Sequence, residues 1–322
     1  MIRRGLRILL VVAGAAFAED KPLPLAKSTT LPSGGSYFVE GRQEIVWGQE
    51  ISIQKGTRLA GQGENAVLVV SGALQVRGIF GDSVKIDNLA IEVSEKCERV
   101  HLESVDLNGC AIRTVPDKAC EARIHLEEVR LDGCPVELTL KKGEVTILNS
   151  RTKGPVKIVA VPEEGKRTAV SAFVNACNVD RDFYAEGIDS LVVRACLFSG
   201  TKIGFKDCAE LAFDANIVKS PSILFEQTQP GGFRKTALQK SDFHGCKLVF
   251  KVPRADPKKD NIPCDKCWFQ GRTKKEEILG KDIVDGTTDE TTGAFIVFRK
   301  INERELMLGG MTTQRGMPGS NK

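Results

Sequence analysis

A short pattern of apolar residues recurs along most of the chain. Counted from zero, each copy has apolar residues at positions 0, 2, 7 and 12, a small or apolar residue at position 5, and often glycine at position 9. The copies recur about every 22 residues, and such a fixed period indicates a repeat protein. Four clear copies begin at Val100, Ile124, Leu191 and Leu211, and five weaker ones begin at Val84, Val145, Ala172, Thr236 and Ile262.

The apolar positions predict strands. Positions 0 and 2, 5 and 7, and 12 and 14 each have the two-residue period of a short strand with one buried face. Three such strands per copy predict an all-β fold, namely a right-handed parallel β-helix solenoid of about ten or more coils. Equivalent positions would stack in ladders about 4.8 Å apart, so that Leu102, Leu126 and Val193 share one interior column. Recurrent glycines, such as Gly109 and Gly200, are expected at a corner that needs positive φ.

A leucine-rich repeat is the alternative interpretation. The residues from 102 to 112 also fit the leucine-rich pattern of apolar residues. The segments between the copies have no helical periodicity, however, and the extra alternating pairs favour strands. We therefore prefer the parallel β-helix.

The copies resemble the parallel β-helix repeats of the pectin-lyase-like superfamily, over about residues 40–275. Those repeats read apolar-x-apolar-x-x-Asn-x-apolar, and Asn216 occupies the asparagine position of the copy that begins at Leu211. The resemblance implies the fold and a link to carbohydrates. It implies no particular activity, because the catalytic motifs of the polygalacturonase-like, pectin methylesterase-like and pectate-lyase-like enzymes are missing; only fragments such as His244-Gly245 occur.

The two ends of the chain differ from the repeats. Three arginines, an apolar run from Ile8 to Phe17 and an A-x-A site ending at Ala18 predict a signal peptide over residues 1–18, with twin-arginine export as the alternative. The protein is therefore expected to be exported, to the periplasm or the extracellular space. We expect a linker over 19–35, the β-helix over 36–275 with its opening coils from Ile51 to Val76, a C-terminal capping segment over 276–306 and a disordered tail over 307–322.

Charge narrows the range of partners. The formal net charge of +4 falls to about +1 when the three leader arginines are removed, which gives no electrostatic reason to expect nucleic-acid binding. No segment after the leader approaches the roughly 20 apolar residues of a membrane span. The oligomeric state is left open.

The ten cysteines follow the repeat. Cys110, Cys134 and Cys246 share position 10, whereas Cys177, Cys196 and Cys267 share position 5, and they are expected to stack inside as small apolar residues. In an exported protein, neighbouring coils also bring thiols within disulfide range. The candidate bridges are Cys110–Cys134, Cys177–Cys196 and Cys97–Cys120. Cys264 and Cys267 have redox or zinc spacing, but without a second ligand pair we predict no metal site and no cofactor.

One outward-facing patch contains candidate catalytic residues. His101 and His125 share position 1 of consecutive copies, and Glu103 and Glu127 share position 3 on the same face. The four side chains could supply a general acid and base or bind a divalent cation. A solvated polar ladder is the simpler interpretation. Further binding candidates on the outer surface are Trp268, an aromatic platform, and the charged ladder of Asp106 and Arg130.

Two functions remain. The first is a secreted, non-catalytic β-helix whose elongated surface binds polysaccharide, a cell-envelope component or a protein. The second is a carbohydrate-active enzyme, a polysaccharide lyase or glycoside hydrolase, with catalytic residues His101, His125, Glu103 and Glu127. The missing enzyme motifs favour the first.

Overall fold

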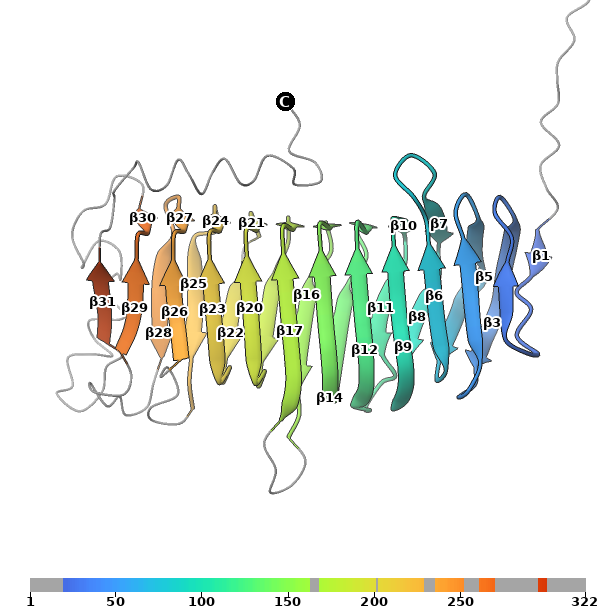
Figure 1. The fold of residues 1–322 in the computed structure, drawn as a ribbon, viewed down its shortest axis with the longest axis horizontal. Helices are drawn as coiled ribbons and strands as arrows, with labels where there is room; N and C mark the ends of the chain where they lie inside the picture. The colour runs from blue at the N-terminus through green and yellow to red at the C-terminus, as the bar shows by residue number, and fades with distance from the viewer. Residues whose placement is uncertain are drawn as a thin grey trace, which may run out of the picture.

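The protein is a parallel β-solenoid of about nine turns, with about 23 residues per turn and partial turns at the ends. The computed structural model describes residues 20–162, 168–200, 202–228, 235–251, 261–269 and 295–299. Within these ranges the chain is all strand and connection, without a helix, and therefore without one that is long and apolar enough to cross a membrane. Figure 1 shows the strands side by side along the long axis. The expected leader and tail lie outside the described residues.

Three faces surround the core, and the chain visits them in the order 1, 2, 3. Face 1 contains β2 (Thr29–Leu31), β4 (Glu50–Gln54), β6 (Ala73–Arg77), β9 (Lys96–Glu103), β12 (Cys120–Glu127), the second part of β14 (Val136–Leu148), β17 (Ala169–Asn175), β20 (Ser190–Arg194), β23 (Glu210–Asp214), β26 (Lys235–Gln239), β29 (Asn261–Asp265) and β31 (Phe295–Arg299). These strands carry positions 0 and 2 of the repeat.

Faces 2 and 3 are likewise built from one strand, or part of a strand, of each turn. Face 2 contains β1 (Lys21–Pro22), the first parts of β3 (Ser36–Ile45) and β5 (Arg58–Val70), β7 (Val84–Asp87), β10 (Val105–Asn108), β13 (Arg130–Asp132), β15 (Arg151–Thr152), β18 (Asn178–Val179), β21 (Leu197–Phe198), β24 (Ile217–Val218), β27 (Asp242–Phe243) and β30 (Trp268–Phe269). Face 3 contains the second parts of β3 and β5, β8 (Ala90–Val93), β11 (Ala111–Thr114), the first part of β14, β16 (Val156–Ala160), β19 (Phe183–Glu186), β22 (Ile203–Lys206), β25 (Ser222–Glu226) and β28 (Lys247–Lys251).

The predicted interior column is confirmed. Leu102 pairs in register with Leu126, and the same column reaches Val193 through β14 and β17. All three side chains are at most 1% exposed. Because every turn contributes an inward residue at the same place, the core is continuous from one end of the solenoid to the other.

The corner between faces 1 and 2 is a single residue in the left-handed region at position 4, and it is usually not glycine. Asn149, Ala176, Ala195 and Ala215 have φ between 49° and 55°. Each donates its amide N–H to the carbonyl of position 3 in the next turn, at about 3.0 Å. These hydrogen bonds continue the parallel ladder around the bend, which offsets the cost of the left-handed conformation.

The glycines at position 9 have two different roles. Gly109 and Gly133 have positive φ, as expected. Gly200 does not; instead, a Cβ there would lie 1.9 Å from the carbonyl oxygen of Arg181 in the preceding turn. The expectation of positive φ is therefore wrong for Gly200, where glycine permits a close backbone approach.

Three expectations about boundaries need correction. The copy expected to begin at Val84 is out of register, because Val84 pairs with Val105 of face 2 and residues 78–83 form an inserted loop. The segment 19–35, expected to be a linker, contains β1 and β2, which pair with β3 and β4. Within the expected capping segment, β31 extends the ladder by pairing in parallel with β29. The other residues of that segment lie outside the described ranges.

The corner makes a testable prediction. We expect Ala195→Val to destabilise the protein by about 1 kcal/mol, because a β-branched side chain tolerates the left-handed region poorly. Ala212→Val is the matched control, since Ala212 is exposed in the middle of β23, where valine suits the extended backbone. Urea unfolding monitored by circular dichroism measures both. Equal midpoints for the two variants would contradict this account of the corner.

Candidate functional site

The structure brings the four predicted catalytic residues together. His101 and Glu103 lie on β9, and His125 and Glu127 lie in register with them on β12. The imidazole centroids are 4.6 Å apart, and the ring planes are inclined by 37°. Oε2 of Glu127 is 3.1 Å from Nε2 of His125, whereas Oε2 of Glu103 is 3.7 Å from Nε2 of His101. Each histidine therefore faces the carboxylate of its own strand, and only His125 and Glu127 are close enough for a hydrogen bond.

The histidine patch, defined as these four residues, lies on an open part of face 1. Arg99 and Arg123 precede the histidines on the same two strands, and Thr146 continues the histidine ladder on β14. Together with Glu144 they line a depression of about 250 Å³. This volume is below the range of about 300–1,000 Å³ that encloses small ligands. The patch is thus a shallow contact surface.

Burial and neighbouring charges shift the pKa of His101. Its side chain is 29% exposed. Desolvation lowers the pKa of His101, and the neighbouring His125 lowers this pKa further, while Glu103 acts in the opposite direction. The lowered pKa favours the neutral form of the His101 imidazole, which lies beside that of His125. A neutral imidazole next to a His–Glu hydrogen bond could accept a proton from a substrate.

Metal binding receives no support from this geometry. Among the described residues, no three His, Cys, Asp or Glu side chains converge closely enough to hold a metal ion. The histidine patch contains the right residue types, but each imidazole nitrogen Nε2 faces a carboxylate of its own strand rather than a common centre.

The other predicted binding residues lie away from the histidine patch. Asp106 and Arg130 are in register on face 2, with 3.8 Å between Oδ1 and Nε. The Arg130 side chain is 68% exposed, so this ion pair contributes little. Trp268 is also on face 2, but on β30 near the other end, where its ring lies 5.5 Å from that of His244. The predicted site residues therefore lie in three separate places: the histidine patch, the Asp106–Arg130 pair and Trp268.

Sequence reasoning missed a buried carboxylate beside Trp268. Asp242, on β27, is in register with Trp268 and is 1% exposed. Among the described residues, neither of its carboxylate oxygens has a hydrogen-bond partner. Burial raises the pKa of Asp242 to about 6. The repeat gave no signal for it, because an outward position is normally exposed.

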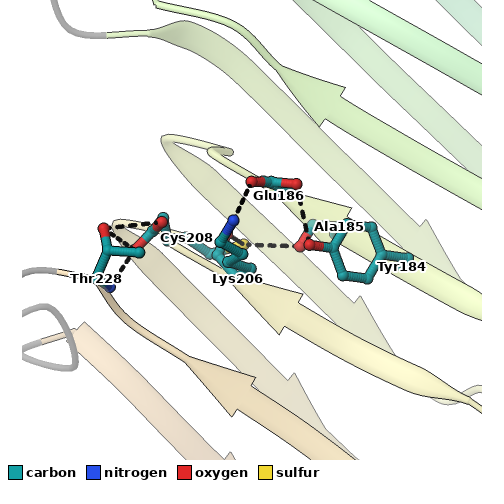
Figure 2. A network of polar contacts seen from close by, with 7 residues as sticks. Tyr184, Ala185, Glu186, Lys206, Cys208 and Thr228 are labelled. Atoms are coloured by element: carbon teal, nitrogen blue, oxygen red, sulfur yellow. Dashed lines mark hydrogen bonds and ion pairs between the residues drawn. The ribbon is translucent and has the colours of Figure 1, made fainter. Parts of the chain in front are cut away.

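Face 3 carries a polar network that the sequence also did not reveal. Tyr184 Oη donates to Glu186 Oε2 at 2.9 Å, and Lys206 Nζ donates to Glu186 Oε1 at 2.7 Å (Figure 2). Burial alone would raise the pKa of Glu186, but the hydrogen bonds from Lys206 and Tyr184 lower it. Burial and the Glu186 carboxylate raise the pKa of Tyr184. The same ladder continues to Glu226 and Lys251, so charges alternate along it and stabilise the surface.

A larger hollow lies at the corner between faces 3 and 1. Its volume is about 860 Å³, and the loop 115–119 forms one of its walls. Four cationic side chains line it, from Arg113, Lys118, Lys141 and Lys157. We call this hollow the corner cleft.

The cations of the corner cleft are matched by carboxylates. Nζ of Lys141 is 2.8 Å from Oε1 of Glu95, and Nζ of Lys118 is 4.0 Å from Oε2 of the same residue. The hydrogen bond from Lys141 lowers the pKa of Glu95. Arg113 pairs with the buried Glu92 at 2.8 Å, and Lys157 is in register with Glu137. The cleft is therefore rich in donors and acceptors without a strong net charge.

All ten cysteines are buried. They stack inside as expected, but their thiols also donate hydrogen bonds to backbone carbonyls. The Cys196 thiol, for example, donates to the carbonyl of Arg194 at 3.1 Å. Cys110 and Cys134 occupy equivalent places in adjacent turns, as do Cys177 and Cys196. The three disulfide pairings stay predictions.

The fold and these surfaces define the chain as a parallel β-solenoid protein with polar ladders and a sizeable polar cleft on its outer surface. In comparisons with protein-family models, curated proteins and solved structures, the chain matches none. The resemblance to the pectin-lyase-like superfamily, like the handedness of the solenoid, therefore stays a prediction.

The histidine patch makes a prediction about pH. Because the pKa of His101 is lower in the folded protein than in the unfolded chain, the unfolded chain binds more protons as the pH falls below about 6.5. His101 should therefore contribute a loss of stability between pH 7.5 and pH 5, whereas Asp242, whose pKa is raised to about 6, contributes a gain over the same range. Because His101→Gln removes only the first contribution, the variant should lose less stability than the parent protein, or gain more. Urea midpoints at the two pH values measure the effect. The interpretation fails if the variant and the parent protein lose the same amount.

Proposed function

We propose that the protein is an exported, non-catalytic solenoid that binds polysaccharide, with the corner cleft as the main contact. The observation that carries this proposal is the polarity of the cleft. It has the volume of a small-ligand site, and its lining offers ammonium, guanidinium, carboxylate and hydroxyl groups.

The charge balance of the cleft indicates which class of ligand it can bind. Arg113 pairs with Glu92, Lys118 and Lys141 share Glu95, and Lys157 is in register with Glu137. These carboxylates offset much of the positive field that would otherwise attract a polyanion. Paired charges still donate and accept hydrogen bonds, which suits the hydroxyl groups of a neutral glycan. The rigid parallel ladder beneath the cleft holds these groups in fixed places without an ordering cost on binding.

Export is part of the proposal and rests on the sequence of residues 1–18, which lie outside the described ranges. The exported chain would begin at Glu19.

The cleft is tested by glycan binding. We expect a glycan array to detect binding to neutral polysaccharides, and Lys141→Ala to weaken it about ten-fold, because a hydrogen bond to a charged group contributes about 1.5 kcal/mol. Lys219→Ala is the matched control, since Lys219 is an exposed lysine that follows β24, away from the cleft. Titration calorimetry with the best glycan gives the affinities. Equal weakening by both variants, or no glycan binding at all, would reject the cleft as a sugar site.

A carbohydrate-active enzyme is the second candidate, because the hydrogen bond between His125 and Glu127 resembles the arrangement of a general base with its orienting carboxylate. The same glycans, incubated with the protein and analysed by mass spectrometry, distinguish the two functions. Cleavage products that disappear in the His101→Ala, His125→Ala double variant would establish the enzyme. Binding without products would leave the scaffold as the function.

A further inference from the structure

An exposed tryptophan lies on a tight turn at the corner between faces 3 and 1, where the chain passes from β3 to β4. Residues 46–49 form this turn. The Gln49 N–H donates to the carbonyl of Val46 at 3.0 Å, and Gly48 has a φ of 80°. This hydrogen bond and the positive φ at the third residue are typical of a type II turn, which favours glycine there. Trp47 is 72% exposed, so the turn holds a large aromatic ring in solvent.

The following turns of the solenoid hold this tight turn in place. Oε1 of Glu98 accepts the Gly48 N–H at 2.8 Å. A Cβ on Gly72 would lie 2.5 Å from the carbonyl oxygen of Val46, so that glycine permits the close packing of the two corners. The backbone that carries Trp47 is therefore ordered before any ligand binds, which reduces the entropy cost of binding.

A polar hollow adjoins the tight turn, with Gly48 as part of its lining. Its volume is about 490 Å³, within the range of about 300–1,000 Å³ for small-ligand sites. The polar groups that line it include four hydroxyls and two carboxylates, from Ser28, Thr29, Thr30, Ser52, Glu50 and Glu98. We call this site the N-terminal hollow.

The charges of the N-terminal hollow favour a neutral ligand. Nη2 of Arg99 is 2.9 Å from Oε2 of Glu50, so this carboxylate is paired. As far as the structure describes the lining, it contains no lysine or arginine, and its carboxylates disfavour an acidic glycan. The hydroxyl groups of a neutral glycan can donate to these carboxylates and exchange hydrogen bonds with the serine and threonine hydroxyls. The C–H face of a sugar ring can stack on the Trp47 indole.

The N-terminal hollow and the corner cleft lie along the same edge of the solenoid. The last residues of face 3 in four successive turns are in register, namely Ile45, Val70, Val93 and Thr114. Because the corner directly follows each of them, Trp47 lies two turns before Glu95 and three turns before the loop 115–119. At about 4.8 Å per turn, these separations are about 10 Å and about 14 Å. Glu95 lines the corner cleft and Glu98 lines the N-terminal hollow, so the two sites are neighbours.

Exposed apolar residues gather at this edge. Among the residues that the structure describes, five large apolar side chains are exposed, and Val46, Trp47 and Val161 lie at the corner between faces 3 and 1. The other two belong to the inserted loop 78–83, at the corner between faces 1 and 2. Val161 lines the corner cleft, five turns after Trp47, or about 24 Å along the axis. The edge therefore combines polar hollows with apolar contacts at both ends, as a glycan with polar and apolar ring faces requires.

We propose that one extended neutral glycan chain lies along this edge, with the N-terminal hollow and Trp47 as a second subsite beyond the corner cleft. The inference rests on the proposed function, because the corner cleft is the first subsite. Trp47 stacks on a sugar ring, and the hydroxyls of the hollow bind its polar edge. Once the cleft holds the chain, binding at the second subsite is intramolecular, so a long chain binds more tightly than a short one.

The test is titration calorimetry with oligosaccharides of linear neutral glucans, mannans and xylans, from a disaccharide to chains that span about 24 Å. The longest chains should bind the parent protein at least about ten-fold more tightly than the disaccharide. Trp47→Ala should remove about ten-fold of the affinity for the long chains and leave that for the disaccharide unchanged. Phe80→Ala is the matched control, because Phe80 is a 91% exposed aromatic residue at a different corner, and it should change neither affinity.

Failure of the second subsite is distinguishable from failure of the proposed function. If none of these oligosaccharides binds at any length, both fail. If they bind and Lys141→Ala weakens them, but Trp47→Ala weakens the long chains no more than the disaccharide, the second subsite alone is overturned. The same holds if the long chains bind no more tightly than the disaccharide.

Tryptophan fluorescence gives an independent readout. The chain has two tryptophans, so that in Trp268→Phe the emission comes from Trp47 alone. A saturating long oligosaccharide should shift this emission to shorter wavelength and protect it from quenching by acrylamide, because a sugar ring then covers the indole. The second subsite is also overturned if the emission and its quenching do not change.

Discussion

The hydrogen bond that each corner residue donates to the next turn is the interaction on which the rest of this structure depends. At Asn149, Ala176 and Ala195 the chain turns through one left-handed residue, and the amide at that residue continues the ladder of the flanking strands. An unpaired amide at a buried bend would cost about 1–3 kcal/mol in every turn. Because the bond forms only when the next turn has an equivalent corner, it fixes the register of all three faces at once. The stacking of side chains, inside and outside, follows from this register.

The interior could be predicted from sequence because burial selects residues strictly. Leu102, Leu126 and Val193 are where the pattern predicted them, and the pairing of His101 with His125 follows from the same register. The pattern fails where a turn changes length or apolarity. Val84 was assigned to the wrong face because the loop 78–83 shifts the count of positions, and β1 and β2 were missed because a partial turn has too few apolar residues to show a period.

The outer surface was less predictable, because its chemistry depends on what covers each residue. The sequence showed that His101 and Glu103 share a face, but not that burial and His125 together lower the pKa of His101. Asp242 occupies an outward position by register and is nevertheless buried. The corner cleft arises from the loop 115–119, which lies between copies of the repeat and follows no template. Ladders place residues beside one another, whereas loops decide which of them are accessible.

Serine and cysteine fill the same hydrogen-bonding role behind the corners of the solenoid. Behind a corner, a small polar side chain is needed to accept an amide N–H from the preceding turn. Serine does this at Ser150 and Ser241, whose hydroxyl oxygens accept the amides of Val129 and Asn216. The Cys134 sulfur does the same for Cys110. Since serine suffices for the hydrogen bond, the structural role alone does not require sulfur at two successive corners.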